Sequence, residues 1–393
     1  MVTFIPFPGY RPAIGDGDSV EDRISPPYDV IDDDYLAELQ SNIHNITRLT
    51  LNPDDDRRYH GSRKELEQWI ADGALKQDEP SFYVYEQTFE DDGEKMTRMG
   101  VVGLLKTEPY EEGGVIPHEE TFSEVKEDRL NLLRDMETHL ESIFGIHDSF
   151  NKSLYRKIRD NCRLVYRYVD SEGVEHRYSV LCHEKICNEI TSELRDQKVL
   201  IADGHHRYET ALAYSQENPK SEKKGYVLAT LVAGDDPGLV IWPTHRLVLN
   251  DEVSEEDAIA KISDSMETKE VTEEEMLAEL GDWMMGLRFR SGKCYLAKFG
   301  GDGMYALDTY VAQEKILKYV YNWDGAEGTV DYDAEMPSAL KKIEEGRYDL
   351  AILLNRPKLE EVWSLSVRGK RMPKKTTFFY PKIWSGFVTY RMV

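Results

Sequence analysis

Five consecutive residues, Asp203-Gly204-His205-His206-Arg207, carry most of the chemistry that this sequence offers. They follow a short apolar segment typical of a buried strand and precede a segment typical of a helix. A helix N-terminus has unpaired backbone N–H groups and a partial positive charge, so it binds anions readily. Gly204 lets the backbone approach a ligand closely, and the two histidines and Arg207 add potential donors. The pattern predicts a phosphate-binding turn.

Two other interpretations of this run remain open from the residues alone. Asp203 could act only as a helix cap, with the histidines as ordinary polar surface. Asp203, His205 and His206 could instead form a dinuclear metal site, although neighbouring histidines on a helix point in different directions and suit one ion poorly. Cations at a helix N-terminus are unfavourable by roughly 0.3–1 kcal/mol each. A bound phosphate would offset that cost, which favours the phosphate interpretation.

A second polar motif includes a candidate general base. His118 and Glu119 precede a T-x-x-E pattern formed by Thr121 and Glu124, which predicts the start of a helix. A loop before that helix could direct Glu119 into a cleft, where a carboxylate can accept a proton. The helix itself places Lys126 and Arg129 three residues apart on one face. The alternative is an ordinary solvated face of charged residues.

Three weaker features add candidate ligand contacts. A double proline forces an extended or turn conformation directly before Tyr28 and Asp29. A Pro-Thr pair precedes His245 and Arg246. Lys375 belongs to a basic stretch near the C-terminal end, whose lysines are Lys374, Lys375 and Lys382. Structural roles, or an ion-pair network in the case of the lysines, explain these features equally well.

The composition indicates a globular chain and disfavours some partners. The 393 residues have a net charge of −25, which repels phosphate backbones and disfavours nucleic acid as a partner. The 4 cysteines show no CxxC spacing, so neither a zinc site nor a disulfide framework is expected. Without a basic leader or a run of ~20 apolar residues, we expect a cytoplasmic protein with no membrane segment. The sequence is silent on the oligomeric state.

The order of the elements predicts an α/β (α+β) protein with mixed sheets and flanking helices, because strands and helices do not alternate regularly enough for a doubly wound sheet. Residues 254–290 are expected to form acidic amphipathic helices and residues 304–307 a strand. We expect a division near Leu249. The region 1–249 would then carry the three main motifs, and 250–393 would be a C-terminal α/β region.

Taken together, the motifs identify a resemblance to the domain-of-unknown-function-1015 family. The matching segments occur in order along nearly the whole chain. They are P-P-Y-D-V-I (26–31), H-E-E-T (118–121) followed by Lys126 and D-R-L (128–130), D-G-H-H-R-Y-E-T-A-L (203–212), P-T-H-R (243–246) and M-P-K-K-T-T-F (372–378). One departure is that no proline separates Ser142 from Ile143. The family name itself implies no activity.

The D-G-H-H-R run also resembles, more distantly, the phosphate-binding turn of the superfamily of ParB-type partition proteins, sulfiredoxins and free-serine kinases. This resemblance implies a ParB/sulfiredoxin-like strand-to-helix turn. In such a turn Gly204, His205, His206 and Arg207 would hold nucleotide phosphates, and Asp203 would hold Mg²⁺ or the acceptor hydroxyl.

The main hypothesis from this resemblance is a kinase that uses Mg²⁺ and a nucleotide, ATP or ADP, to phosphorylate a small hydroxyl compound such as free L-serine. Its expected catalytic residues are Asp203, Glu119 and His205, with Asp203 also the metal ligand. Expected phosphate contacts are Gly204, His206, Arg207, His118, Lys126, Arg129 and Lys375, and expected substrate contacts are Tyr28, Asp29, His245 and Arg246.

Two alternatives stay open. One is a nucleotide-binding switch protein of the ParB type, whose DNA-binding form is disfavoured by the acidic charge. The other is a metal-dependent hydrolase that uses Asp203, His205, His206 and His118.

Overall fold

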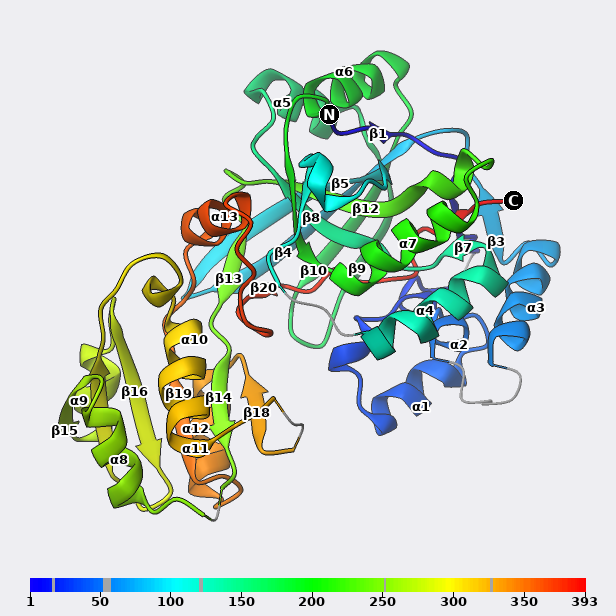
Figure 1. Ribbon diagram of the computed structural model, residues 1–393. Helices are drawn as coiled ribbons and strands as arrows, with labels where there is room; N and C mark the ends of the chain where they lie inside the picture. Colours follow the sequence, from blue (N-terminus) through cyan, green and yellow to red (C-terminus); the bar gives the residue numbers. More distant parts are fainter. Residues whose placement is uncertain (16–17, 52–57, 120–122, 251, 326–327) are drawn as a thin grey trace. The chain divides into compact units, whose positions relative to one another are not determined.

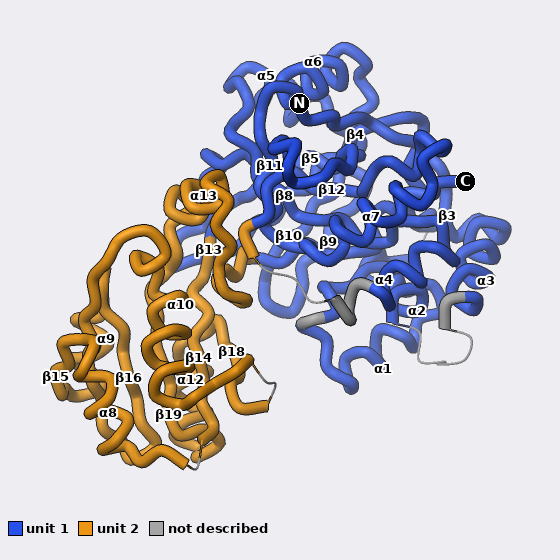
Figure 2. The backbone as a smooth tube through the Cα atoms, in the orientation of Figure 1, with its two compact units in different colours: residues 1–117, 121–240, 381–393 blue, residues 118–120, 241–380 orange. Residues whose placement is uncertain are grey.

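The computed structural model describes residues 1–15, 18–51, 58–119, 123–250, 252–325 and 328–393. The chain forms two compact units (Figure 2). Unit 1 consists of Met1–Pro117, Thr121–Val240 and Pro381–Val393, and unit 2 consists of His118–Glu120 and Ile241–Tyr380. The domain division expected near Leu249 stays a prediction. In the described part of the chain, no helix has both the length and the apolar character that crossing a membrane requires.

Unit 1 is built on a mixed sheet. Its strand order is β6 (Val115–Ile116), β11 (Val199–Asp203), β8 (Ile143–His147), β12 (Tyr226–Ala233), β5 (Glu94–Lys106), β4 (Phe82–Asp91), β10 (Glu175–Leu181) and β9 (Arg163–Val169), with β1 (Phe4–Ile5) also paired to β5. The β11–β6 and β12–β8 pairs are parallel, whereas β11–β8, β12–β5, β4–β5, β10–β4, β10–β9 and β1–β5 are antiparallel. The expected α/β class with mixed sheets is therefore confirmed.

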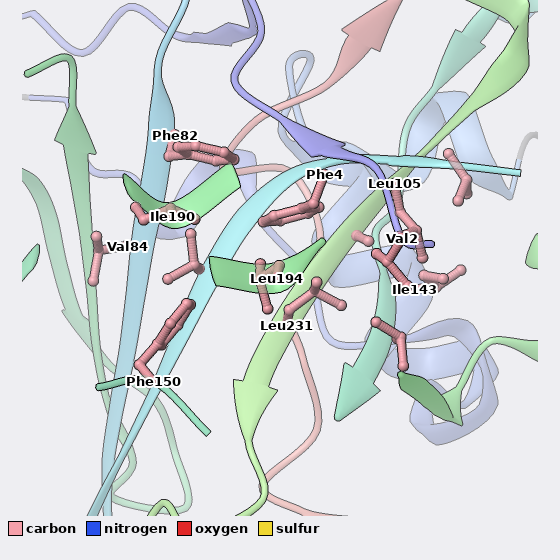
Figure 3. Packing of buried hydrophobic residues seen from close by; sticks show 14 of the residues in the cluster. Val2, Phe4, Phe82, Val84, Leu105, Ile143, Phe150, Ile190, Leu194 and Leu231 are labelled. Carbon is pink, nitrogen blue, oxygen red and sulfur yellow. The ribbon is translucent and has the colours of Figure 1, made fainter. Parts of the chain in front are cut away.

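Alternation along the strands of unit 1 gives the sheet two apolar faces. Phe82 and Val84 of β4 join one buried cluster, and the intervening Tyr83 and Tyr85 join another, because successive strand residues point to opposite faces. Helices α5 (Lys152–Asn161) and α6 (Glu184–Leu194) contribute to the first cluster, which Figure 3 shows around Phe82 and its neighbours.

The helix that follows β11 packs against both helices and strands of unit 1. That helix is α7 (His205–Glu217), and it contacts α4 (Ser123–Met136), β12 and β8 (Figure 1). Helix α3 (Arg58–Ala71) packs in turn against α4.

The smaller elements of unit 1 are β2 (Tyr10–Pro12), β3 (Leu75–Gln77), β7 (Thr138–His139), β21 (Tyr390–Arg391), α1 (Asp33–Ser41), α2 (Thr47–Thr50) and the 3-10 helices η1 (Glu21–Arg23), η2 (Tyr28–Val30), η3 (Tyr110–Glu112) and η4 (Lys223–Gly225).

Unit 2 is built on an antiparallel sheet. Its order is β15 (Glu267–Val271), β17 (Cys294–Lys298), β16 (Met284–Phe289), β19 (Leu350–Leu353), β14 (His245–Val248) and β18 (Val330–Asp333). Leu350 and Ile352 of β19 pack with α8 (Glu255–Ser263) and the helical segment that includes α10 (Asp308–Val311), a π-helix (Ala312–Lys318) and α11 (Tyr319–Tyr321). Ala351 and Leu353 pack on the other face with α9 (Glu273–Glu279) and α12 (Met336–Glu344).

Short elements complete unit 2. They are a 3-10 helix η5 (Gly303–Ala306), helix α13 (Leu359–Val367), and strand β20 (Phe378–Tyr380), which pairs with β13 (Val240–Trp242).

Two sequence predictions about unit 2 are wrong. Residues 254–290 do not form helices alone, because strand β15 follows α8 and strand β16 follows α9. The pairing of β15 with β17 and of β16 with β19 overrides the helical pattern of these acidic residues. Residues 304–307 form no strand, since most of them belong to a 3-10 turn that begins at Gly303, where φ is +59°.

Tyr208 fixes the start of α7 within unit 1. Its buried hydroxyl donates to the Glu108 carbonyl at 2.8 Å and accepts from the Glu108 N–H at 3.0 Å. Tyr208→Phe removes the partner of both backbone groups, which should lower the free energy of unfolding by about 1–3 kcal/mol. Urea unfolding followed by circular dichroism measures this change. Tyr110→Phe, which removes the hydroxyl of a half-buried neighbour, should cost less; equal losses in the two variants would contradict the assignment.

Candidate functional site

The candidate turn joins a buried strand to a helix without an intervening loop. Strand β11 ends at Asp203, and α7 begins at His205. Between them Gly204 is left-handed, with φ +88° and ψ +31°, and it is the N-cap of α7 with no capping side chain. A left-handed residue is readily tolerated only when it is glycine. The strand-to-helix turn expected from the sequence is therefore present.

The Asp203 carboxylate lies between two cations. The Arg207 Nη2 atom donates to Asp203 Oδ2 at 3.1 Å, and the Lys382 Nζ atom lies 3.8 Å from Asp203 Oδ1. A second Arg207 nitrogen, Nη1, donates to the Ser142 carbonyl. These three ionised side chains carry two positive charges and one negative charge, next to the positive end of a helix. The turn thus brings two cationic side chains to one carboxylate in a chain whose net charge is −25.

The Arg207 side chain folds back over Gly204. A Cβ atom at position 204 would lie 3.0 Å from Arg207 Nε and Nη2 and 3.1 Å from Cζ. Residue 204 therefore has two reasons to be glycine: its backbone conformation and the space that the guanidinium occupies.

Arg207 also lines a pocket of about 450 Å³ within unit 1. Arg129 of α4 and Thr210 of α7 line it too, together with Glu141. The Thr210 Oγ1 atom is buried and has no hydrogen-bond partner among the described residues. The rest of the lining is Thr50, Leu132, Leu133, Thr138, His139 and Leu140. Two arginines from two separate motifs thus share one pocket with an apolar wall.

Tyr28 belongs to the same neighbourhood. Its ring lies under the Arg129 guanidinium, with the Arg129 Cζ atom 4.5 Å from the ring centroid. Such a cation–π contact orients the guanidinium without neutralising it. The structure thereby connects three predicted site residues, Tyr28, Arg129 and Arg207, within unit 1.

The histidines of unit 1 differ in their surroundings. His205 is buried and His206 is half-buried at the start of α7. His139 of the pocket is also buried, and its Nε2 atom lies 3.0 Å from the Tyr226 carbonyl oxygen, so it serves as the donor. Burial lowers the pKa of His139 to about 4. This ring is therefore neutral near pH 7 and adds no charge to the pocket.

In unit 2, the residues around Glu119 form a second polar cluster. The Glu119 Oε1 atom accepts from the Thr376 backbone N–H at 3.1 Å and lies 3.4 Å from His118 Nε2. The same His118 atom lies 2.8 Å from Thr377 Oγ1. The Met372 N–H donates to the His118 carbonyl at 2.7 Å. The H-E and M-P-K-K-T-T motifs therefore meet here and hold the Glu119 carboxylate in one orientation.

Arg246 and His245 lie inside unit 2. Arg246 is fully buried, donates to the carbonyls of Thr244 and Lys375, and lies 5.5 Å from the Tyr332 ring centroid. Burial lowers the pKa of Arg246 to about 10, and the nearby Tyr332 and Glu119 partly oppose this shift. The Leu354 N–H donates to His245 Nδ1 at 3.1 Å, and burial lowers the pKa of His245 to about 4. Both residues thus hold the backbone around Lys375 and Leu354 in place.

The predicted site residues fall into the two units as follows. Unit 1 contains Tyr28, Arg129, Asp203, Gly204, His205, His206 and Arg207, and unit 2 contains His118, Glu119, His245, Arg246 and Lys375. The side chains of Asp29 and Lys126 lie outside the described residues, as does Thr121 of the expected capping box. The roles assigned to all these residues stay predictions.

Three residues of this neighbourhood were missed by sequence reasoning. Lys382 was visible only as part of a basic stretch, although it is the second cation beside Asp203. Thr210 follows Arg207 by three residues on α7, so helical periodicity could have placed it beside the arginine. Glu141 carries no comparable signal, because it precedes β8 and meets α7 only through tertiary folding.

A preformed metal centre is not supported by the described residues. Among them, no three His, Cys, Asp or Glu side chains gather in a way that could hold a metal ion. The dinuclear hydrolase site that the sequence left open therefore has no geometric support in this part of the chain. A single carboxylate such as Asp203 remains compatible with Mg²⁺ that arrives bound to phosphates, because such ions need only one or two protein carboxylates.

The fold and the site define an α/β protein with an arginine-bearing strand-to-helix turn. Residues 4–312 match the family described as "Protein of unknown function (DUF1015)", and the chain belongs to this family. No curated protein matches the sequence.

Several solved structures are remotely similar. A conserved hypothetical protein from Pyrococcus furiosus is 18% identical with a TM-score of 0.39, covering 69% of this chain and 89% of that chain. A free serine kinase in complex with AMP is 17% identical with a TM-score of 0.38, covering 70% and 89%. SbnI with a C-terminal truncation, from Staphylococcus aureus, is 8% identical with a TM-score of 0.38, covering 72% and 85%. Similarity this remote carries no argument about function.

Gly204→Ala should destabilise the protein and displace Arg207. The left-handed backbone costs alanine roughly 1–2 kcal/mol, and the new Cβ would crowd the guanidinium at 3.0 Å. Gly113→Ala is the matched control, because Gly113 has φ +77° with nothing within 4 Å of its Cβ position. Thermal unfolding should show a larger loss for Gly204→Ala than for Gly113→Ala. Equal losses would mean that the contact with Arg207 adds nothing.

Proposed function

We propose that this protein is a nucleotide-dependent phosphotransferase that phosphorylates the hydroxyl group of a small metabolite. The observation that carries the proposal is the position of Arg207, which lies over the first turn of α7 beside Lys382 and shares a pocket with Arg129. Phosphoryl transfer needs positioning and charge neutralisation more than covalent chemistry. A helix N-terminus with nearby guanidinium groups supplies both.

The two arginines of the unit 1 pocket suit this task. A guanidinium is planar, stays charged, and can donate two parallel hydrogen bonds to a phosphate. Arg207 is held by Asp203 and Ser142, and Arg129 is held over the Tyr28 ring. Both donors are therefore oriented in advance, which favours stabilisation of charge that develops during transfer. Gly204 and His206 would add contacts to the phosphates at the same turn, and His205 would be a catalytic residue there.

Asp203 is the residue that would hold Mg²⁺. Its carboxylate is partly exposed and makes ion pairs that a divalent cation could replace. When bound with a nucleotide, Mg²⁺ would neutralise phosphate charge. Asp203 also keeps Arg207 and Lys382 close together, a role that needs no metal.

Glu119 is the proposed acceptor of the hydroxyl proton. The Thr376 N–H and His118 fix its carboxylate within unit 2. His118, Lys126 and Lys375 are proposed phosphate contacts. We propose that Tyr28 and Asp29 contact the substrate, and that the buried His245 and Arg246 support the backbone around Leu354 and Lys375. These roles follow from the resemblance and from the local contacts described above.

The first experiment is phosphorus NMR of the purified protein with Mg²⁺, nucleoside di- and triphosphates, and a panel of small hydroxyl compounds. L-Serine is the first acceptor to test, because the D-G-H-H-R turn resembles that of the free-serine kinase superfamily. A phosphomonoester signal that depends on both nucleotide and acceptor would identify the donor and the product. Absence of turnover with every pair, in folded protein, would contradict the proposal.

Arg207→Ala should reduce turnover by about 100-fold or more, which is typical when a donor to developing charge is lost. Its fold should survive, because Arg207 is partly exposed and no core residue changes. Arg134→Ala is the control: Arg134 is an exposed arginine of unit 1 that pairs with Glu217. Initial rates at saturating nucleotide compare the two variants. Undiminished turnover in Arg207→Ala would remove the basis of the assignment.

Glu119→Gln should lower kcat with little change in the KM for nucleotide, since glutamine keeps an acceptor for the Thr376 N–H but cannot take up a proton. The general-base contribution is typically 100- to 10,000-fold, so we expect a loss of about 100-fold or more. Steady-state kinetics at several pH values measures it. A raised KM with unchanged kcat would instead assign Glu119 to binding.

A further inference from the structure

Unit 2 contains a pocket of about 450 Å³ whose lining residues lie outside the motifs discussed so far. Asp308 and Thr309, at the start of α10, form one side of it. Glu361, in the first turn of α13, forms another, and Trp283 and Asp282 also line it. The helical segment that begins at Asp308 continues into a π-helix, Ala312–Lys318, and π-helical turns occur frequently at functional sites.

Three carboxylates, those of Asp282, Asp308 and Glu361, line the pocket together with two cationic side chains, those of Arg356 and Lys358. Asp308 is held by Asn355, whose N–H and Nδ2 atoms donate to Asp308 Oδ2 at 2.9 and 2.7 Å. Among the described residues, the half-buried Glu361 side chain makes no hydrogen bond or ion pair. Burial raises the pKa values of both carboxyl groups, although Lys358 opposes the shift at Glu361 and the Asn355 hydrogen bonds oppose it at Asp308. The Lys358 Nζ atom lies 2.7 Å from Asp282 Oδ2, and the two side chains form an ion pair.

Two further side chains favour a ligand at this place. Thr309 is only 3% exposed, and its Oγ1 atom has no hydrogen-bond partner within the part of the chain that the structure describes. Trp283 is 40% exposed and has φ +66°. A left-handed backbone at a bulky residue costs of order 1–3 kcal/mol and is concentrated at ligand-binding sites. A buried unpaired hydroxyl and a strained, exposed tryptophan therefore border the same pocket.

We propose that this pocket binds a small ligand that carries a protonated amino group. An ammonium group has three donors and no acceptor, which matches the Asp308 and Glu361 carboxylates and the Thr309 hydroxyl oxygen. It relieves the repulsion between the carboxylates, and the Trp283 ring offers it an aromatic face. The site is separate from the proposed phosphotransfer chemistry, because none of its residues takes part there.

Saturation-transfer difference NMR with the full chain tests this site. Ethanolamine and putrescine carry an amino group, whereas lactate offers a hydroxyl and a carboxylate without one. We expect saturable signals from the amines and none from lactate. Glu361→Gln and Asp308→Asn should each weaken ethanolamine binding by about tenfold or more, as expected when one charge-assisted hydrogen bond is lost.

Two control variants make the result specific. Glu360→Gln removes the same charge one residue away, from an exposed side chain that does not line the pocket, and it should leave binding unchanged. Arg207→Ala should also leave ethanolamine binding unchanged, even if it abolishes phosphotransfer, so failure of one proposal is distinguishable from failure of the other. If Asp308→Asn does not fold, the binding measured with Glu361→Gln decides, because the Glu361 side chain is partly exposed. Lactate binding equal to that of ethanolamine, no binding of any amine, or equal affinity in Glu361→Gln and the unaltered protein would overturn the proposal.

Discussion

The Arg207 guanidinium lies over the first turn of α7, 3.0–3.1 Å from the place that a Cβ atom of residue 204 would take, and glycine leaves it this room. The left-handed backbone at Gly204 joins a buried strand to a helix, and Arg207 occupies the space beside it. From that position the arginine reaches Asp203, Ser142 and the pocket beside α4. The polar groups of the unit 1 site are arranged around this one contact, while Tyr208, one residue further along, anchors the same helix to Glu108.

Environment separates the arginines of this chain into different roles. Arg246 is fully buried, and carbonyl oxygens and the Tyr332 ring satisfy it, so it stabilises the interior of unit 2. Arg207 and Arg129 instead line a pocket, and each is oriented by a neighbour. The sequence presents Arg207 and Arg246 in similar motifs, next to a histidine in both cases. Only the folded structure distinguishes an arginine that stabilises the interior from one that lines a pocket.

The parts of the fold that depend on local chemistry could be predicted from the sequence. An apolar segment followed by Asp-Gly specifies a strand, a left-handed turn and a helix, and β11 and α7 follow that order. The α/β class follows likewise from strand and helix patterns. The contact of Lys382 with Asp203 could not be predicted, because it joins residues that are distant in the sequence. The strands β15 and β16 were missed for a related reason: their pairing partners, not their own residues, determine their conformation.

The path of the chain has a consequence for folding during synthesis. Unit 1 is interrupted by unit 2 and takes up the chain again with Pro381–Val393. Phe387 and Tyr390 of that segment are buried in the unit 1 core, and β21 pairs with β7. Most of unit 2 therefore precedes, in the order of synthesis, the segment that completes the core of unit 1. Unit 1, and with it the Lys382 contact to Asp203, is completed only after residues 381–393 have emerged, so an incompletely synthesised chain would expose apolar surface on unit 1.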